Sequence, residues 1–215
     1  MAAAALLLMD GPALAATCPG HANQLCFYSQ VDPAGSKGSQ SLALGLGVSR
    51  LEAESADAQN PDEPGDNDTS QLLRVYLTKG LPFPVDFGLM LGTSPSGHFQ
   101  QAGAHAQWTA FEGFKLPAVT LRTSFLKSSW VDMVDSRMEM ASVDSKTVEV
   151  ITSWGILGVL TPYAGLGVTE VGNEKTRTHC AGLEIQAMPP FMRVGVESRS
   201  AFAKRQFMAK ISLGL

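Results

Sequence analysis

Hydrophobic and polar residues alternate along most of the chain, and the alternation is cleanest in its last stretch, residues 205–215. Phe207, Ala209, Ile211, Leu213 and Leu215 share one face, whereas the residues between them are mostly polar or small. A period of two belongs to a β-strand, whose successive side chains point to opposite faces of the sheet. The chain therefore ends in a predicted amphipathic strand.

The same period recurs in about ten segments, separated by Gly, Pro, Asn, Asp and Ser. The predicted strands lie near residues 41–54, 69–80, 84–93, 99–113, 117–130, 140–155, 160–171, 176–188, 191–199 and 204–215. Tight turns alternate with polar, mostly longer loops at 52–70, 94–98, 128–137, 172–177 and 198–205. This arrangement is typical of an all-β, antiparallel up-and-down transmembrane β-barrel, here with about ten strands and roughly eight to twelve possible.

One strand face collects large apolar residues, and the other collects glycine and small residues interleaved with charges. The inside of a narrow barrel needs small residues, and an unpaired ion there costs several kcal/mol. We therefore predict that Arg74, Arg122, Arg193 and Lys210 neutralise Asp86, Glu149, Glu184 and Glu197 in a lumen charge network. Alternation alone leaves open a secreted soluble β-barrel that binds an apolar ligand, in which the apolar face would point inward.

The amino terminus predicts three divisions of the chain. An apolar run at residues 1–9 and the Ala13-Leu14-Ala15 triplet indicate a signal peptide over 1–15, followed by a periplasmic segment over 16–40 and a barrel over 41–215. Cys18 and Cys26 could form a disulfide in an oxidising periplasm, or both could remain thiols, as Cys180 would.

The sequence contains one weak candidate for a metal site, and it does not indicate a cofactor or a nucleic-acid site. Asp62, Asp66 and Asp68 offer oxygen ligands for calcium without the spacing of a defined calcium loop, so a solvated acidic loop is the preferred interpretation. No cofactor is predicted. The net charge of −4, with scattered Lys and Arg, argues against nucleic acid as a partner.

Catalysis would require a nucleophile, a base and an orienting acid in one place. His98 near Ser96 and His179 near Glu174 are the histidines placed near the predicted outer rim, and no Gly-x-Ser-x-Gly motif is present. We expect no enzymatic activity, with a lipid-modifying surface enzyme as the less favoured alternative.

Residues 116–124 (LPAVTLRTS), residues 160–168 (LTPYAGLGV) and the terminal strand resemble the small outer-membrane barrels of Gram-negative bacteria. This broad group includes OmpA-like and opacity-type porin-fold proteins. The resemblance implies a location in the outer membrane, with membrane lipid, lipopolysaccharide and the barrel assembly machinery as partners. It also implies a structural or narrow-pore transport role, and it specifies no solute.

Overall fold

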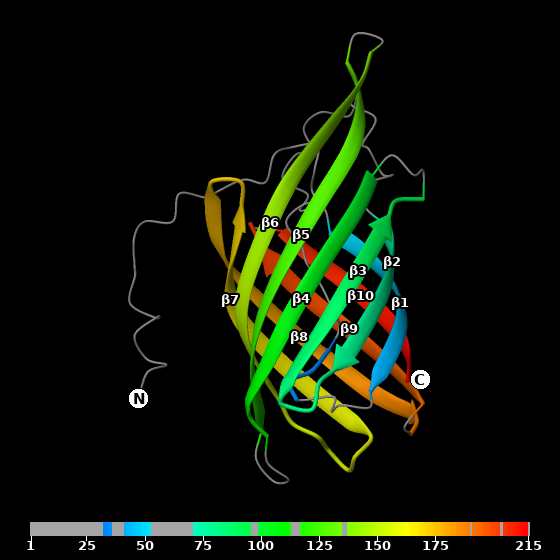
Figure 1. Cartoon of the computed structure of the whole chain (residues 1–215), viewed down its shortest axis with the longest axis vertical. Coiled ribbons are helices and arrows are strands. Elements are labelled where there is room, and N and C mark those ends of the chain that lie inside the picture. The colour runs from blue at the N-terminus through cyan, green and yellow to red at the C-terminus, as the bar shows by residue number, and fades with distance from the viewer. Residues whose placement is uncertain are drawn as a thin grey trace.

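The alternating segments form ten strands within the described part of the computed structural model (Figure 1). The structure describes residues 32–35, 41–52, 71–95, 99–112, 117–134, 137–189, 191–202 and 204–214. The strands are β1 (Leu42–Glu52), β2 (Gln71–Gly80), β3 (Val85–Thr93), β4 (Phe99–Phe111), β5 (Ala118–Val134), β6 (Arg137–Ser153), β7 (Leu160–Val171), β8 (Glu174–Met188), β9 (Met192–Ala201) and β10 (Lys204–Gly214).

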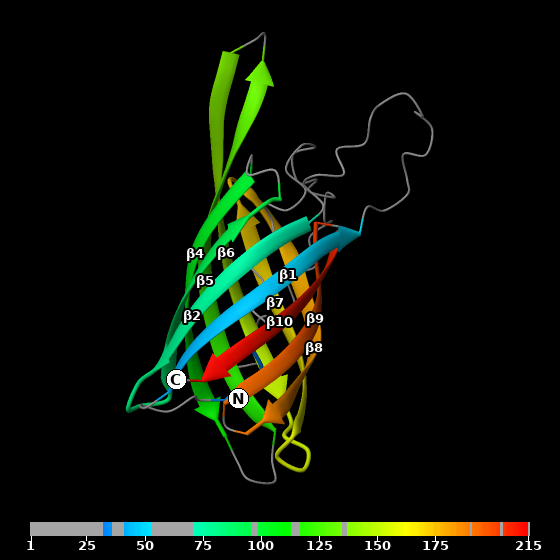
Figure 2. The same cartoon turned by 90° about the vertical axis from the view of Figure 1, so that its right-hand side faces the viewer.

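Each strand pairs antiparallel with its neighbours in sequence, and the first strand pairs with the last. The β1–β10 seam runs from Ala43↔Gly214 to Glu52↔Arg205, and Figure 2 shows β1 lying between β2 and β10. This seam closes the sheet, so every strand has a partner on both sides. The predicted antiparallel barrel of about ten strands is therefore confirmed.

The two strand faces differ sharply in polarity. On β2, for example, the pattern of exposure alternates along the whole strand, with Leu73, Val75 and Leu77 exposed and Arg74 and Thr78 buried. Leu89 and Leu91 are 58% and 63% exposed, although both lie within β3. Such a barrel has an apolar exterior and a polar interior, which suits a surrounding lipid bilayer.

The two ends of the barrel also differ. Exposed aromatic residues gather at the end that carries the connections β2–β3, β4–β5, β6–β7 and β8–β9: Phe83, Trp108, Phe111, Trp154 and Phe191. Trp and other aromatic residues favour the interface between hydrocarbon and water. This end therefore marks one membrane boundary.

At the opposite end, three predicted loops are shorter than expected. β5 continues to Val134 and β6 begins at Arg137. The two strands project beyond the others as a long hairpin (Figure 1). β7 turns into β8 through Gly172 and Asn173 alone, where Gly172 has a φ of 58° that glycine adopts without strain. β9 continues to Ala201. Polar residues suggested loops here, but strands that leave the bilayer can be polar and still pair.

Within the described residues, no helix is long and apolar enough to cross a membrane.

Candidate functional site in the barrel lumen

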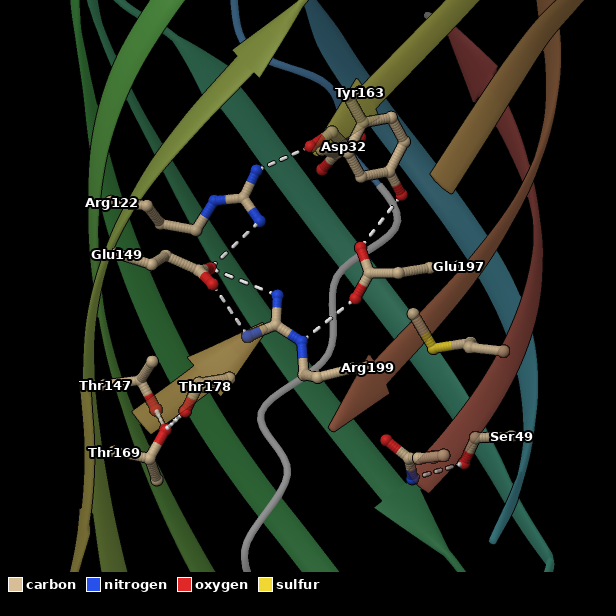
Figure 3. Close-up of polar contacts among 12 residues, drawn as sticks. Asp32, Ser49, Arg122, Thr147, Glu149, Tyr163, Thr169, Thr178, Glu197 and Arg199 are labelled. Carbon is tan, nitrogen blue, oxygen red and sulfur yellow. Dashed lines mark hydrogen bonds and ion pairs between the residues drawn. The ribbon is translucent and has the colours of Figure 1, made fainter. Parts of the chain in front are cut away.

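Two arginines and two glutamates form what we call the central ion cluster: Arg122 on β5, Glu149 on β6, and Glu197 and Arg199 on β9 (Figure 3). The Arg199 guanidinium contacts both oxygens of Glu149, with N–O distances of 2.8 and 3.2 Å. Its Nε lies 3.0 Å from Glu197 Oε1, and Arg122 Nη1 lies 3.4 Å from Glu149 Oε1. The cluster thus links three strands across the lumen.

Burial makes the loss of any one of these contacts costly. All four residues of the central ion cluster are at most 2% exposed. The Tyr163 hydroxyl on β7 donates to Glu197 Oε2 over 2.8 Å, so this carboxylate has a partner on each oxygen. Buried ions are tolerated when they are paired and hydrogen-bonded, and removing one partner is costly. The cluster is electrically neutral as a unit.

Residues 32–35, which we call the lumen strap, lie inside the barrel rather than outside it. The Asp32 carboxylate lies 3.2 Å from Lys210 Nζ on β10, and its backbone carbonyl accepts from Arg122 Nη2 over 2.6 Å. Figure 3 shows Asp32 on the Arg122 side of the lumen. The strap therefore joins the central ion cluster to β10.

Three further hydrogen bonds hold the end of the strap. The Ser153 hydroxyl donates to the Ala34 carbonyl over 2.7 Å. The Gly35 N–H donates to Thr120 Oγ1 over 3.1 Å, and the Gly35 carbonyl accepts from Gln107 Nε2 over 3.1 Å. Side chains from β4, β5 and β6 thus satisfy main-chain groups of the strap, as buried backbone requires.

The remaining predicted charges occupy separate places in the lumen. Arg193 Nη1 lies 3.7 Å from Glu184 Oε1, but the Arg193 side chain is 34% exposed. Arg74 donates to Gln101 Oε1 over 3.1 Å, and Asp86 accepts from Gln107 over 3.1 Å. Of the predicted pairings, the structure brings together Arg122 with Glu149 and Arg193 with Glu184.

Lys210 contacts the strap and an aromatic ring. Besides Asp32, its ammonium lies 4.8 Å from the centre of the Tyr76 ring, a cation–π distance. The Tyr76 hydroxyl in turn donates to Met208 Sδ over 3.0 Å. Lys210 thus pairs with Asp32 of the lumen strap, an acid that the predicted charge network did not include.

Two charged residues were missed by the sequence reasoning. Arg199 lies where the predicted strand 191–199 and the predicted polar loop 198–205 overlap, and it was not included in the charge network, yet it continues the inward-facing series of β9 two residues after Glu197. A spacing of two residues on a strand places both side chains on the same face, so the sequence could have shown that Arg199 faces the lumen. Asp32 carried none, because it lies outside every alternating segment and its contact with Arg122 spans 90 residues.

Glycines allow bulky side chains to lie flat against the lumen wall. A Cβ at Gly182 would overlap the Tyr163 ring, and a Cβ at Gly88 would overlap the His105 ring. Each glycine faces its aromatic partner across an adjacent strand pair, Gly182↔Tyr163 and Gly88↔His105. The glycine-rich face is thus required by the packing of the interior.

Beside the central ion cluster, hydroxyl groups line part of the wall. The Thr169 hydroxyl lies 2.9 Å from that of Thr147 and 2.5 Å from that of Thr178, and Figure 3 shows this chain of threonines. On the opposite wall the Gln206 amide donates to Ser49 Oγ over 3.2 Å. The lumen is polar at this level.

Several predicted site residues lie outside the described residues: Cys18, Cys26, Asp62, Asp66, Asp68 and His98. The disulfide and calcium hypotheses therefore stay predictions. In the part of the chain that is described, no cluster of His, Cys, Asp and Glu could hold a metal ion. His179 is exposed on β8, whereas Cys180 beside it is a buried free thiol.

No protein-family model matches the sequence, and no curated protein is similar to it. In structure, the chain is similar to the KdgM porin, at 8% identity over 80% of this chain and 99% of the porin, with a TM-score of 0.48. The amino-terminal β-barrel domain of OprF from Pseudomonas aeruginosa is 6% identical over 83% of this chain and 100% of that domain, with a TM-score of 0.44. For the NanC porin the identity is 9%, the coverage 81% and 100%, and the TM-score 0.41.

At these identities the similarity concerns the fold alone. The surface of the chain indicates where the protein resides. A closed antiparallel barrel with an exposed apolar band, a ring of aromatic residues at one boundary and a polar interior suits a lipid bilayer. Antiparallel barrels of this construction lie in bacterial outer membranes. The protein is a small outer-membrane β-barrel.

Proposed function

We propose that this barrel forms a narrow, polar pore that is constricted by the central ion cluster and the lumen strap. The supporting observation is the composition of the lumen, where ions, hydroxyls and amides from all ten strands lie buried behind an apolar exterior. A polar lumen can hold water, whereas a barrel of about ten strands leaves little free width once its side chains are placed. A small solute or ion is therefore the suitable cargo.

One alternative conflicts with the described residues, and the other depends in part on His98, which lies outside them. A soluble barrel that binds an apolar ligand needs its large apolar face inside, but Leu89, Leu121 and Val150 are exposed on the outer wall. A lipid-modifying enzyme needs a base near a nucleophile and an acid. His105 is buried against Gly88, and His179 lies on the outer surface. The expectation of no enzymatic activity stays a prediction.

A purely structural role is the second candidate, because the paired ions and the strap also brace the wall from inside. Ion conduction separates the two roles. We would purify the full chain from washed outer membranes, verify folding by its heat-modifiable migration, and record currents in planar bilayers. Small unitary steps would support the pore. Folded protein that never conducts, in wild-type form or with a released strap, would leave the structural role.

We also propose that outward-facing basic residues bind the phosphates of lipopolysaccharide. Lys127, Lys146, Lys175, Arg177 and Arg205 are exposed at the end of the barrel with the longer strands. Cationic side chains at this level would lie beside anionic headgroups of the outer leaflet. Replacing Lys127 and Lys146 by Gln should reduce the lipopolysaccharide that copurifies, and unchanged lipopolysaccharide would contradict the proposal. Insertion by the barrel assembly machinery is proposed on the resemblance alone.

A further inference from the structure

The contacts of the lumen strap are those of a bound ligand. The four residues of the strap make one ion pair and four hydrogen bonds with side chains on β4, β5, β6 and β10. The Asp32 carboxylate and the Lys210 ammonium are 2% and 3% exposed. The wall thus binds one carboxylate and several backbone groups, and it also packs the Ala34 methyl against buried apolar side chains such as Tyr76 and Ile151.

The buried charges around the strap balance only when Asp32 is counted. Four cations, Arg74, Lys210, Arg122 and Arg199, lie with four anions, Asp32, Asp86, Glu149 and Glu197, so these described ions are neutral together. Without the Asp32 carboxylate the same wall carries one excess positive charge, centred on Lys210. A charge in a narrow lumen attracts counter-ions and sets the selectivity of conduction.

We infer that Lys210, Arg122, Gln107, Thr120 and Ser153 form a binding site for short acidic peptides in the lumen, which residues 32–35 occupy as a tethered ligand. Lys210 binds the carboxylate, and the other side chains bind the neighbouring peptide groups. A soluble ligand of this class competes with the strap, and a displaced strap leaves an anion-selective path. This inference rests on the proposed pore.

The first test uses full-chain variants in planar bilayers under a KCl gradient. Asp32→Asn removes the carboxylate and keeps Lys210, so we expect larger currents and a reversal potential shifted toward the chloride equilibrium potential. Asp32→Asn combined with Lys210→Met removes both charges and should lose that shift. Asp144→Asn, an acid exposed on the outer face of β6, is the matched control and should behave as wild type.

The second test supplies the ligand in solution. The peptide Val-Asp-Pro-Ala-Gly, capped at both ends, copies residues 31–35. It should block the current of Asp32→Asn, whereas the same peptide with Asn in place of Asp should block much less. In the double variant that lacks Lys210, the two peptides should act equally.

A third variant tests whether the strap lies in the conducting path. Ala34→Cys and Ser153→Cys place thiols on two residues that are close in space, because the Ser153 hydroxyl donates to the Ala34 backbone carbonyl over 2.7 Å. With Asp32→Asn, and with Cys18, Cys26 and Cys180 changed to Ser, the reduced chain should conduct and the oxidised chain should not.

The outcomes separate the two claims. If folded wild type and every variant fail to conduct, the proposed pore is wrong. If Asp32→Asn conducts without a chloride shift, or if the acidic and neutral peptides block it equally, the pore stands and the binding site is refuted. Equal currents from the oxidised and reduced cysteine variants would also refute the inference, because the strap would then lie outside the path.

Discussion

Arg199→Met should destabilise the folded barrel more than any other single truncation in the central ion cluster. Arg199 makes three close contacts, with N–O distances of 2.8 and 3.2 Å to Glu149 and 3.0 Å to Glu197, and it is 2% exposed. The methionine would remove the ion pairs that Arg199 makes with the buried carboxylates of Glu149 and Glu197. Removing one partner of a buried ion pair costs about 3–5 kcal/mol, and we expect a loss of free energy of unfolding in that range.

The measurement is urea-dependent unfolding in lipid vesicles, followed by the fluorescence of Trp108 and Trp154, which lie exposed on the outer wall. Arg193→Met is the matched control, because Arg193 is 34% exposed and its nitrogen lies 3.7 Å from Glu184. It should cost less than about 1 kcal/mol. Adding Glu149→Gln to Arg199→Met restores neutrality and should recover part of the loss.

A loss for Arg199→Met no larger than that of the Arg193 control would refute this reasoning. It would mean that water enters the lumen at the cluster and solvates the remaining carboxylates. Failure of Glu149→Gln to recover any stability would show that the packing of the Arg199 side chain, rather than its charge, carries the effect.

Three further predictions concern the wall. Leu89→Arg places a cation on the lipid-facing surface and should reduce the free energy of folding into vesicles by about 2–4 kcal/mol, whereas Leu89→Met should change it little. Gly182→Ala should displace the Tyr163 ring and cost about 1–3 kcal/mol in urea unfolding, and Tyr163→Ala in the same chain should remove that clash; equal losses with and without Tyr163 would contradict it. Thr169→Val breaks both hydroxyl contacts and should cost about 1–3 kcal/mol, while Thr123→Val on the outer face should be neutral or stabilising.

The strands and their faces could be predicted because each constraint acts within a few residues. A bilayer outside and a narrow lumen inside require opposite side chains at successive positions, so Leu73, Arg74 and Val75 already identify their faces. The contact between Arg122 and Glu149 follows the same logic, since these residues are register partners in the β5–β6 hairpin. Once the hairpin is predicted, their proximity needs no further information.

The rest of the site depends on three-dimensional arrangement. Arg199 reaches Glu149 across the lumen from a strand that is not adjacent to β6, and no local period encodes that distance. The lumen strap is harder still, because residues 32–35 have no strand period and their partners come from four different strands. Nothing in the spacing of Asp32 indicates that it would enter the barrel.

The long β5–β6 hairpin has a further consequence for what the cell surface presents. β4 last pairs with β5 at Phe99↔Trp130, and β7 last pairs with β6 at Ser145↔Val171, whereas the hairpin ladder continues to Val134↔Arg137. Beyond those points, each strand of the ribbon has a partner on one side only among the described residues. An open strand edge offers N–H and C=O groups to any extended polypeptide that adds alongside it. Pairing with this ribbon would depend on main-chain hydrogen bonds, so it would tolerate substitutions of the ribbon's side chains.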